Sequence, residues 1–262
     1  MAEVMTNSQI AATTAAAAAL AGLAYGGWMY ASVWPTSRLF GRTLTAPKKP
    51  DEFALTFDDG PNPSYTPQLL DLLARYNIRA TFFLIGQYAA QQRALTRRIH
   101  EAGHLIGNHT WTHPNLSRTS VAQTHEELRR TSAQLEDITG VAVRYFRPPF
   151  GLRRPATLRI ARSLHLIPVT WNIIGNDWTE RTKLTTEEIA ERVFRLSEKN
   201  YRCGDATNLV LHDGSHRQPA MDRSRSIAAT ALILERYAQS RHFVVLDAWK
   251  DTWKDAWQTS DS

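Results

Sequence analysis

Two neighbouring carboxylates, Asp58 and Asp59, are the first residues of this chain whose type and spacing could do chemistry. They follow a short apolar run, and Gly60 and Pro61 directly after them end the strand that this run predicts. Adjacent acids repel each other, so a cation or a shared proton is expected to hold the pair together. Asp-Asp-Gly-Pro is also the sequence of an ordinary solvated turn, and only the chemistry of later segments favours a site.

Two histidines four residues apart, His109 and His113, supply that chemistry. On a helical turn both imidazoles would face the same way. With one carboxylate of the aspartate pair they would give three protein ligands, which leaves positions for water and substrate on a catalytic divalent ion. Either histidine alone is more commonly a capping or core residue. Histidines without such neighbours are interpreted as structural or exposed, and these are His100, His104, His125, His165, His216 and His242.

The elements that must position these side chains follow from the alternation of short apolar runs with longer segments of helical period after Pro50. This alternation predicts an α/β fold, a distorted (β/α)7-type barrel of parallel strands, preceded by an N-terminal apolar helix. Strands are expected at 53–57, 80–85, 104–107, 144–147, 166–171, 209–211 and 242–246. Helices are expected at 66–76, 89–102, 121–139, 155–164, 186–197 and 224–240.

Polar residues gather at the C-terminal ends of the expected strands. In a parallel barrel these ends share one face, where active sites are built. The convergence of several such segments favours a site over a set of unrelated turns. The segments are Asp58–Asp59, Asn108–His113, Arg147–Gly151, Asp177–Trp178 and His212–Gly214.

The first fifty residues differ from the remainder of the chain. Residues 4–37 contain no charged side chain, and their Ala-rich centre, 11–33, ends in aromatic residues. Such a run predicts a single membrane-anchoring helix, and the alternative is an Ala-rich helix packed on the domain. We therefore expect an anchor and linker over 1–50, a catalytic barrel over 51–262, and a membrane-anchored protein of the cell envelope. The basic residues after the run favour a cytoplasmic C-terminal domain, whereas an exported domain needs the opposite charge bias. The orientation of the anchor in the membrane therefore stays open.

The composition excludes several classes of protein. The net charge of +6 is spread along the chain, and no motif supports nucleic-acid binding. Cys203 is the only cysteine, which rules out internal disulfides and Cys-rich zinc sites. Near the C-terminus, Trp249, Trp253 and Trp257 are spaced four apart, which predicts one helical face packed on the domain.

Five motifs, in order along the chain, resemble those of the polysaccharide deacetylases, carbohydrate esterase family four. They are Thr56-Phe57-Asp58-Asp59-Gly60, His109-Thr110-x-x-His113, Arg147-Pro148-Pro149-Phe150-Gly151, Asp177-Trp178 and Leu211-His212-Asp213. The resemblance covers about residues 52–246. It implies a distorted barrel that uses one divalent metal ion, commonly zinc with cobalt, nickel or manganese as alternatives. It also implies removal of N-acetyl groups from an amino-sugar polymer or oligomer.

The resemblance assigns a role to each motif residue. Asp59, His109 and His113 would bind the metal, and Asp58 would be the general base, paired with Arg147.

His212 would be the general acid, with Asp177 raising its pKa by opposite charge. The Pro149–Phe150 segment would stabilise the oxyanion through the backbone N–H of Phe150. Trp178 and Leu211 would shape the slot for the acyl methyl group.

Three hypotheses about function remain. The first is metal-dependent N-deacetylation of a cell-envelope polysaccharide such as peptidoglycan or a chitin-like polymer. The second is deformylation or deacetylation of a lipid-linked amino sugar at the membrane. The third is a catalytically silent sugar-binding relative, against which the presence of both Asp58 and His212 argues, because a binding module needs neither a base nor an acid.

Overall fold

The computed structural model describes residues 6–178 and 184–252. Its centre is one sheet of eight parallel strands in the order β5-β4-β3-β2-β1-β7-β6, with β8 also pairing with β1. β5 and β6 lie at opposite edges, so the barrel is curled without closing through strand pairing. The predicted parallel α/β fold is confirmed. The strands are β1 (Glu52–Gly60), β2 (Thr81–Leu84), β3 (Leu105–Asn108), β4 (Tyr145–Phe146), β5 (Ile167–Pro168), β6 (Ile173–Ile174), β7 (Thr207–His212) and β8 (His242–Val244).

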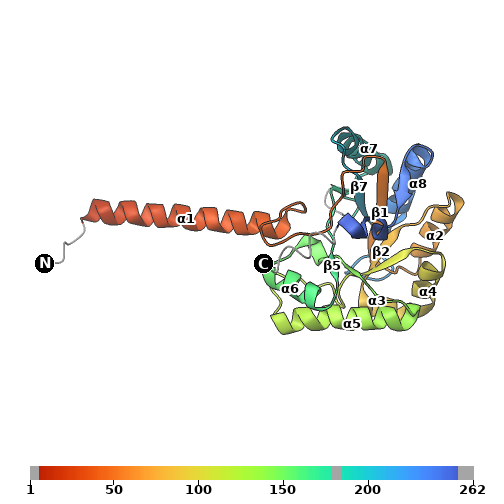
Figure 1. Cartoon of the computed structure of the whole chain (residues 1–262), viewed down its shortest axis with the longest axis horizontal. Helices are drawn as coiled ribbons and strands as arrows, with labels where there is room; N and C mark the ends of the chain where they lie inside the picture. The colour runs from red at the N-terminus through yellow and green to blue at the C-terminus, as the bar shows by residue number, and fades with distance from the viewer. Residues whose placement is uncertain (1–5, 179–183, 253–262) are drawn as a thin grey trace.

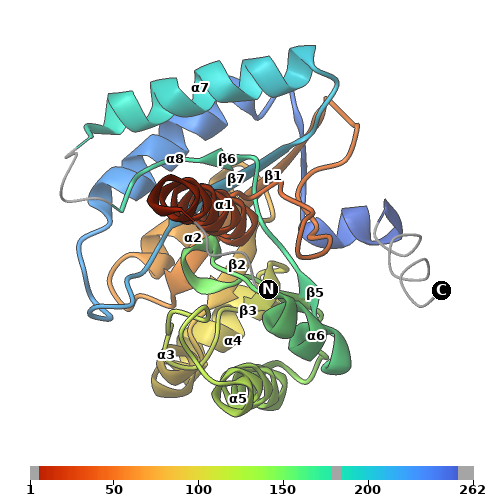
Figure 2. The same cartoon turned by 90° about the vertical axis from the view of Figure 1, so that its left-hand side faces the viewer.

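Helices surround the sheet, with α7 and α8 side by side on one side of the barrel and α5 on the opposite side (Figures 1 and 2). Buried apolar side chains form a large cluster between the sheet and these helices, and a smaller cluster around Phe83, Tyr145 and Trp249. The helices after the first strand are α2 (Thr66–Arg75), α3 (Gly86–Gln91), α4 (Arg93–Glu101), α5 (Val121–Thr139), α6 (Pro155–Ser163), α7 (Thr186–Arg202) and α8 (Ser224–Tyr237), with 3-10 turns η1 (Pro149–Gly151) and η2 (Leu246–Trp249).

Local sequence signals explain where the helices begin and end. Ser120 and Gln123 form a capping box at the start of α5, and Thr185 and Glu188 form one at the start of α7. Gly140 ends α5 with a φ of 74°, a left-handed conformation that glycine adopts without strain.

Two expected elements differ from the structure. The helix expected at 89–102 is two helices, α3 and α4, because Gln92 has non-helical angles (φ −114°, ψ 48°) between them. The strand expected at 166–171 is only β5, and β6 follows it as a separate strand at the other edge of the sheet.

The segment expected to be a linker, 43–50, contacts the barrel. Leu44 is buried and forms a parallel β-bridge with Val169, beside β5. On the other side, Asn208 Nδ2 of β7 donates a hydrogen bond to the carbonyl of Thr45 (2.6 Å), and Ala206 N donates to the carbonyl of Pro47 (2.9 Å). This segment therefore bridges the open seam between the two sides of the sheet. The domain boundary at residue 50 stays a prediction.

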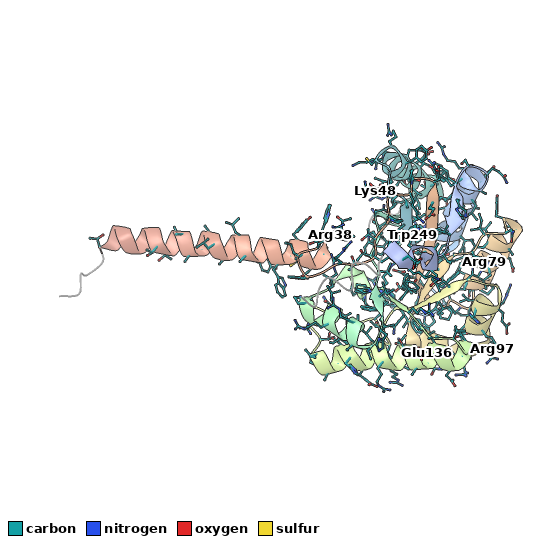
Figure 3. All side chains as sticks on the ribbon, viewed as in Figure 1. Arg38, Lys48, Arg79, Arg97, Glu136 and Trp249 are labelled. Atoms are coloured by element: carbon teal, nitrogen blue, oxygen red, sulfur yellow. The ribbon has the colours of Figure 1, made fainter. Side chains whose placement is uncertain are left out.

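The N-terminal helix α1 (Asn7–Val33) projects away from the barrel (Figures 1 and 3). Its side chains from Thr13 to Tyr30 are exposed, whereas Ala31 and Ser32 near its C-terminal end are buried. Within the described residues, no helix combines the length and the apolar character needed to cross a membrane. The predicted membrane anchor is therefore not supported: α1 is long, but alanine is only marginally apolar.

Near the C-terminus, Trp249 is fully buried and donates a hydrogen bond from Nε1 to Glu52 (2.5 Å), so its predicted packing on the domain is confirmed. Trp253 and Trp257 lie outside the described residues.

Candidate active site

The two aspartates lie where β1 ends, and both are buried. In the β1–β7 pairing Asp58 lies directly opposite His212, so one strand pair brings the first and last motifs together. Asp59 has a φ of 70°, in the left-handed region that few residues other than glycine adopt. This turn of the backbone lets two neighbouring carboxylates have different surroundings.

Asp59, His109 and His113 bring their ligand atoms within 4.8 Å of one another. Asp59 Oδ1 lies 3.4 Å from His109 Nε2 and 3.2 Å from His113 Nε2. Burial alone would raise the pKa of Asp59, but the surrounding imidazoles hold it well below its usual range. Among the described residues this buried Oδ1 has no hydrogen-bond partner. A carboxylate and two imidazoles around one point are a donor set that suits zinc and related divalent ions, so these residues fit the expected metal.

The histidines come together on an irregular loop after β3, and the expectation of a helical turn is wrong. Glu127 of α5 holds this loop, because its carboxylate accepts hydrogen bonds from the backbone N–H groups of Trp111 (2.7 Å) and Thr112 (2.8 Å). His109 Nδ1 lies 2.8 Å from the carbonyl oxygen of Arg147, which makes Nδ1 the donor and leaves Nε2 free to bind a ligand. His113 has a φ of 60°. The two histidines are therefore brought together by a loop that α5 holds in place, and not by the four-residue spacing of a helix.

Arg147 forms a buried ion pair with Asp58. Its Nη1 donates hydrogen bonds to Asp58 Oδ1 and to Thr56 Oγ1, both at 2.7 Å, and its guanidinium lies over the ring of Phe83. Both partners of the ion pair are buried, so the pair is strongly coupled. The predicted pairing of Arg147 with Asp58 is present in the structure.

Asp177 and His212 form the second charged pair. Asp177 accepts hydrogen bonds from the ring Nδ1 (2.9 Å) and backbone N–H (2.7 Å) of His212, and from Ser226 Oγ (2.7 Å). Burial favours a neutral imidazole, but the charge and hydrogen bond of Asp177, together with the charges of Asp59 and Asp58, raise the pKa of His212 above its ordinary value. The ring of Trp178 lies 5.1 Å from that of His212. The predicted pairing of Asp177 with His212 is therefore present in the structure.

Phe150 belongs to the turn η1 and has a φ of 58°. Its ring meets the ring of His113 edge-on, with centroids 4.7 Å apart. Arg153 holds the base of this turn, because its buried guanidinium donates hydrogen bonds to the carbonyls of Gly151 (3.3 Å) and Trp34 (2.7 Å). The turn that carries Phe150 is therefore connected to the residue that follows α1.

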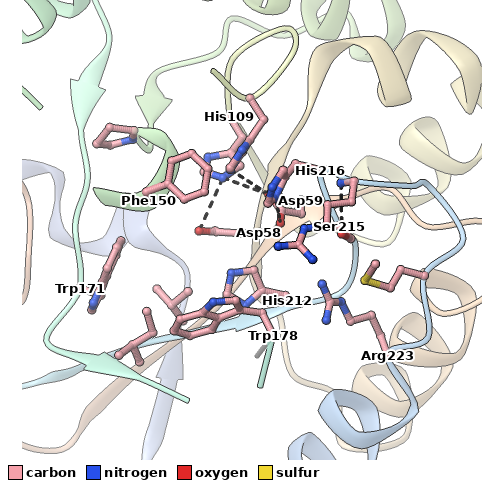
Figure 4. Close-up of a pocket in the computed structure, with 16 residues that line it drawn as sticks. Asp58, Asp59, His109, Phe150, Trp171, Trp178, His212, Ser215, His216 and Arg223 are labelled. Atoms are coloured by element: carbon pink, nitrogen blue, oxygen red, sulfur yellow. Dashed lines mark hydrogen bonds and ion pairs between the residues drawn. The ribbon is translucent and has the colours of Figure 1, made fainter. Parts of the chain in front are cut away.

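These groups open into a cavity of about 600 Å³ (Figure 4). In that view Asp58 lies between His109 and His212. Leu211 does not line the cavity: it packs in the core behind the sheet, while Val210 and His212 face the cavity. Alternation along β7 requires this, since neighbouring side chains point to opposite faces. Pro149 is likewise buried and away from the lining, where Pro148 stands instead.

Sequence reasoning missed several residues of the cavity wall. Pro148 belongs to the third motif but was given no role there, and the others lie outside every motif, so that only nearness in sequence to a motif residue could have suggested a role for most of them. They are Pro148, Trp171, Ile174, Val210, Ser215, His216, Arg217, Met221 and Arg223.

Comparisons with known proteins identify similar polysaccharide deacetylases. Residues 45–169 match the family model for polysaccharide deacetylase. A peptidoglycan-N-acetylglucosamine deacetylase of Bacillus cereus is 33% identical over 205 residues, which are 78% of this chain and 90% of that protein. A chitooligosaccharide deacetylase of Bradyrhizobium is 42% identical over 125 residues, 47% of this chain and 57% of that protein.

The fold is also that of a solved peptidoglycan N-acetylglucosamine deacetylase in complex with 4-naphthalen-1-yl-N-oxidanyl-benzamide. It is 30% identical, with a TM-score of 0.68 over 79% of this chain and 91% of that one. The chain matches only about half of the length of two other similar proteins. It covers 50% of a second peptidoglycan-N-acetylglucosamine deacetylase of Bacillus cereus and 57% of the Bradyrhizobium protein.

Proposed function

The chain belongs to the polysaccharide deacetylase family, and from this premise we propose that it removes N-acetyl groups from the amino sugars of an envelope polysaccharide. The proposed metal ligands are Asp59, His109 and His113, with zinc as the expected ion. Because such a polymer is an envelope component, we also propose that the protein acts in the cell envelope.

One observation carries the proposal. Asp58 and His212 are register partners on β1 and β7, and they line the same cavity beside the ligand cluster. Each has its own buried partner of opposite charge, Arg147 and Asp177 respectively. A carboxylate paired with an arginine next to an imidazole paired with a carboxylate is the arrangement that a base and an acid need in one hydrolytic reaction.

The chemistry assigned to these residues is amide hydrolysis. A divalent ion held by the three ligands would act as a Lewis acid on the amide carbonyl and lower the pKa of water. Asp58 accepts a proton from the attacking water, and Arg147 orients it. His212 then donates its proton to the leaving nitrogen, so the products are acetate and a free amine. The backbone N–H of Phe150 is the proposed donor to the oxyanion.

The apolar wall of the cavity suits an acyl group. Trp171, Ile174, Trp178 and Val210 line it, and they can accept a methyl group without leaving a polar atom unpaired. The names of the similar proteins specify N-acetylglucosamine in peptidoglycan and chitooligosaccharides. We therefore propose N-acetylglucosamine residues as the sugar, and treat formamido sugars as the competing substrate.

The test uses the full chain with zinc added, incubated with peptidoglycan, chitooligomers and formamido sugars, and measures released acetate and formate. Acetate release from an N-acetylated substrate is the expected result. Asp58→Asn should reduce the rate by about 10²–10⁴-fold, while Asp71→Asn on the exposed face of α2 should not change it. Binding of chitooligomers without acetate release would contradict the proposal and favour a silent relative, and release of formate alone would favour a deformylase.

A further inference from the structure

His216 lies on the loop after β7, four residues beyond His212. Its backbone carbonyl accepts a hydrogen bond from the hydroxyl of Tyr88 on α3 (3.1 Å), which fixes the loop to the other side of the site. Its side chain is 34% exposed and lines the cavity, where Figure 4 shows it beside Asp59. No motif includes this residue, and the sequence analysis interpreted it as structural or exposed.

The ring of His216 faces the outer oxygen of Asp59. Its Nδ1 lies 3.7 Å from Asp59 Oδ2, whereas Asp59 Oδ1 faces His109 and His113. The two oxygens of one carboxylate therefore have different partners. A partner on Oδ2 restricts rotation of the carboxylate and keeps Oδ1 directed at the two histidines.

His216 also holds the ring of His113. Metal-binding histidines usually donate their second ring nitrogen to an acceptor, as His109 does toward the carbonyl of Arg147. In the described part of the chain, His113 Nδ1 is buried without any hydrogen-bond partner. Instead the His113 ring stacks on His216, with centroids 4.4 Å apart and planes at 13°, and meets Phe150 edge-on. Stacking takes the place of the missing hydrogen bond.

We propose that His216 is a positioning residue that orients two of the three metal ligands, Asp59 through its outer oxygen and His113 through its ring. The inference rests on the proposed metal site. His216 is not itself a ligand, because among the described residues the ligand atoms that lie within 4.8 Å of one another are those of Asp59, His109 and His113.

The experiment measures zinc affinity of the metal-free full chain by competition with a chromophoric chelator. His216→Ala should weaken zinc binding about 10- to 100-fold, the range for loss of an outer-shell partner. His216→Phe, which keeps a ring for stacking but removes both nitrogens, should weaken binding by a smaller factor. His125→Ala, an exposed histidine on α5, is the matched control and should leave the affinity unchanged.

Cobalt absorption spectra separate positioning from ligation. Wild type and both His216 variants should give the same visible bands at saturating cobalt, because the number of protein ligands is unchanged. A change in band intensity that marks a lost ligand would overturn the positioning role. Equal zinc affinity in wild type and His216→Ala would overturn it as well, while leaving the proposed function intact. Failure of the wild type to bind zinc would overturn both.

Circular dichroism of each variant checks that the fold is retained, which the partial exposure of His216 leads us to expect.

Discussion

The buried carboxyl groups of the site each have a different partner, and this separates their roles. Asp58 pairs with an arginine, Asp59 faces imidazoles, and Asp177 pairs with His212. Asp213 accepts a hydrogen bond from Thr66, and burial raises its pKa to about 7. Neighbouring carboxyl groups can therefore differ in chemical character because their partners differ.

The pair of Asp177 and His212 gives a prediction at this scale. Since the Asp177 charge raises the pKa of His212, Asp177→Asn should lower that pKa and shift the basic limb of the pH–rate profile to lower pH. The measurement is kcat/KM against pH with an N-acetylated substrate, with Asp137→Asn, an exposed aspartate, as the control. A basic limb that stays in place would show that His212 is not the acid.

His104 gives a second prediction, about stability and far from the chemistry. It accepts a hydrogen bond from the backbone N–H of Ala80, and burial, with the nearby charge of Arg79, lowers its pKa from 6.5 to about 4. As the pH falls below 6.5, His104 binds a proton in the unfolded chain but stays neutral in the folded chain until the pH approaches 4. Stability is therefore full above pH 6.5 and declines toward pH 4, by about 3 kcal/mol.

Chemical denaturation between pH 4 and 7 measures this decline. His104→Gln should show a flatter dependence of the unfolding free energy on pH than the wild type, whereas His125→Gln should follow the wild type. If His104→Gln keeps the full slope, other groups cause it.

At the scale of elements, strand pairing alone leaves the barrel open between β5 and β6, and the segment 43–47 bridges this seam. Arg153 adds a second connection, because its guanidinium donates to the carbonyls of Trp34 and Ser37 as well as to Gly151. The chain before β1 therefore supports the turn that carries Phe150.

Leu44→Ala tests the bridging segment. Removing this buried side chain should destabilise the protein by about 2–3 kcal/mol, because it leaves a cavity beside Val169. Leu39→Ala is the control, since Leu39 is 69% exposed and should cost less than about 0.5 kcal/mol. Equal unfolding free energies in urea for the two variants would mean that the segment contributes nothing to the fold.

Gly214→Ala tests the close backbone contact between the end of β1 and the loop after β7. A Cβ added there would overlap the carbonyl oxygen of Asp59 and lie 2.7 Å from the nitrogen of Gly60. Both contacts are with backbone, so Gly214→Ala must displace Asp59 or His212. Zinc binding and deacetylation should both fall by more than about 10²-fold. Gly26→Ala in α1, where nothing lies within 4 Å, should change neither.

At the scale of the whole molecule, the proposed metal site joins separate parts of the fold. Asp59 ends β1, and the two histidines belong to the loop after β3 that α5 holds. Residues distant in sequence meet there only in the folded state, so a metal bound by all three ligands should bind the folded chain in preference to the unfolded one.

Zinc should therefore raise the melting temperature. At free zinc of about 100 times the dissociation constant, binding adds about 2.7 kcal/mol to stability, which corresponds to roughly 5–10 °C for a domain of this size. Differential scanning calorimetry with and without zinc measures the shift. His113→Ala should lose it, and a shift of the same size in that variant would show that zinc binds elsewhere.

The sequence by itself determined which residues converge. Helical period and short apolar runs are local signals, and they located the principal strands and helices of the barrel and the polar groups at the strand ends. Because parallel strands present their C-terminal ends on one face, the order of motifs along the chain was enough to predict that Asp58, His109 and His212 meet.

Only the tertiary structure decided how they meet. Glu127 shapes the histidine loop, His216 reaches the ligands from another loop, and the register of β7 turns Val210 rather than Leu211 into the cavity. The bridge at Leu44 depends in the same way on Val169, a residue far along the chain. These features rest on contacts between irregular segments distant in sequence, and no local periodicity encodes such contacts.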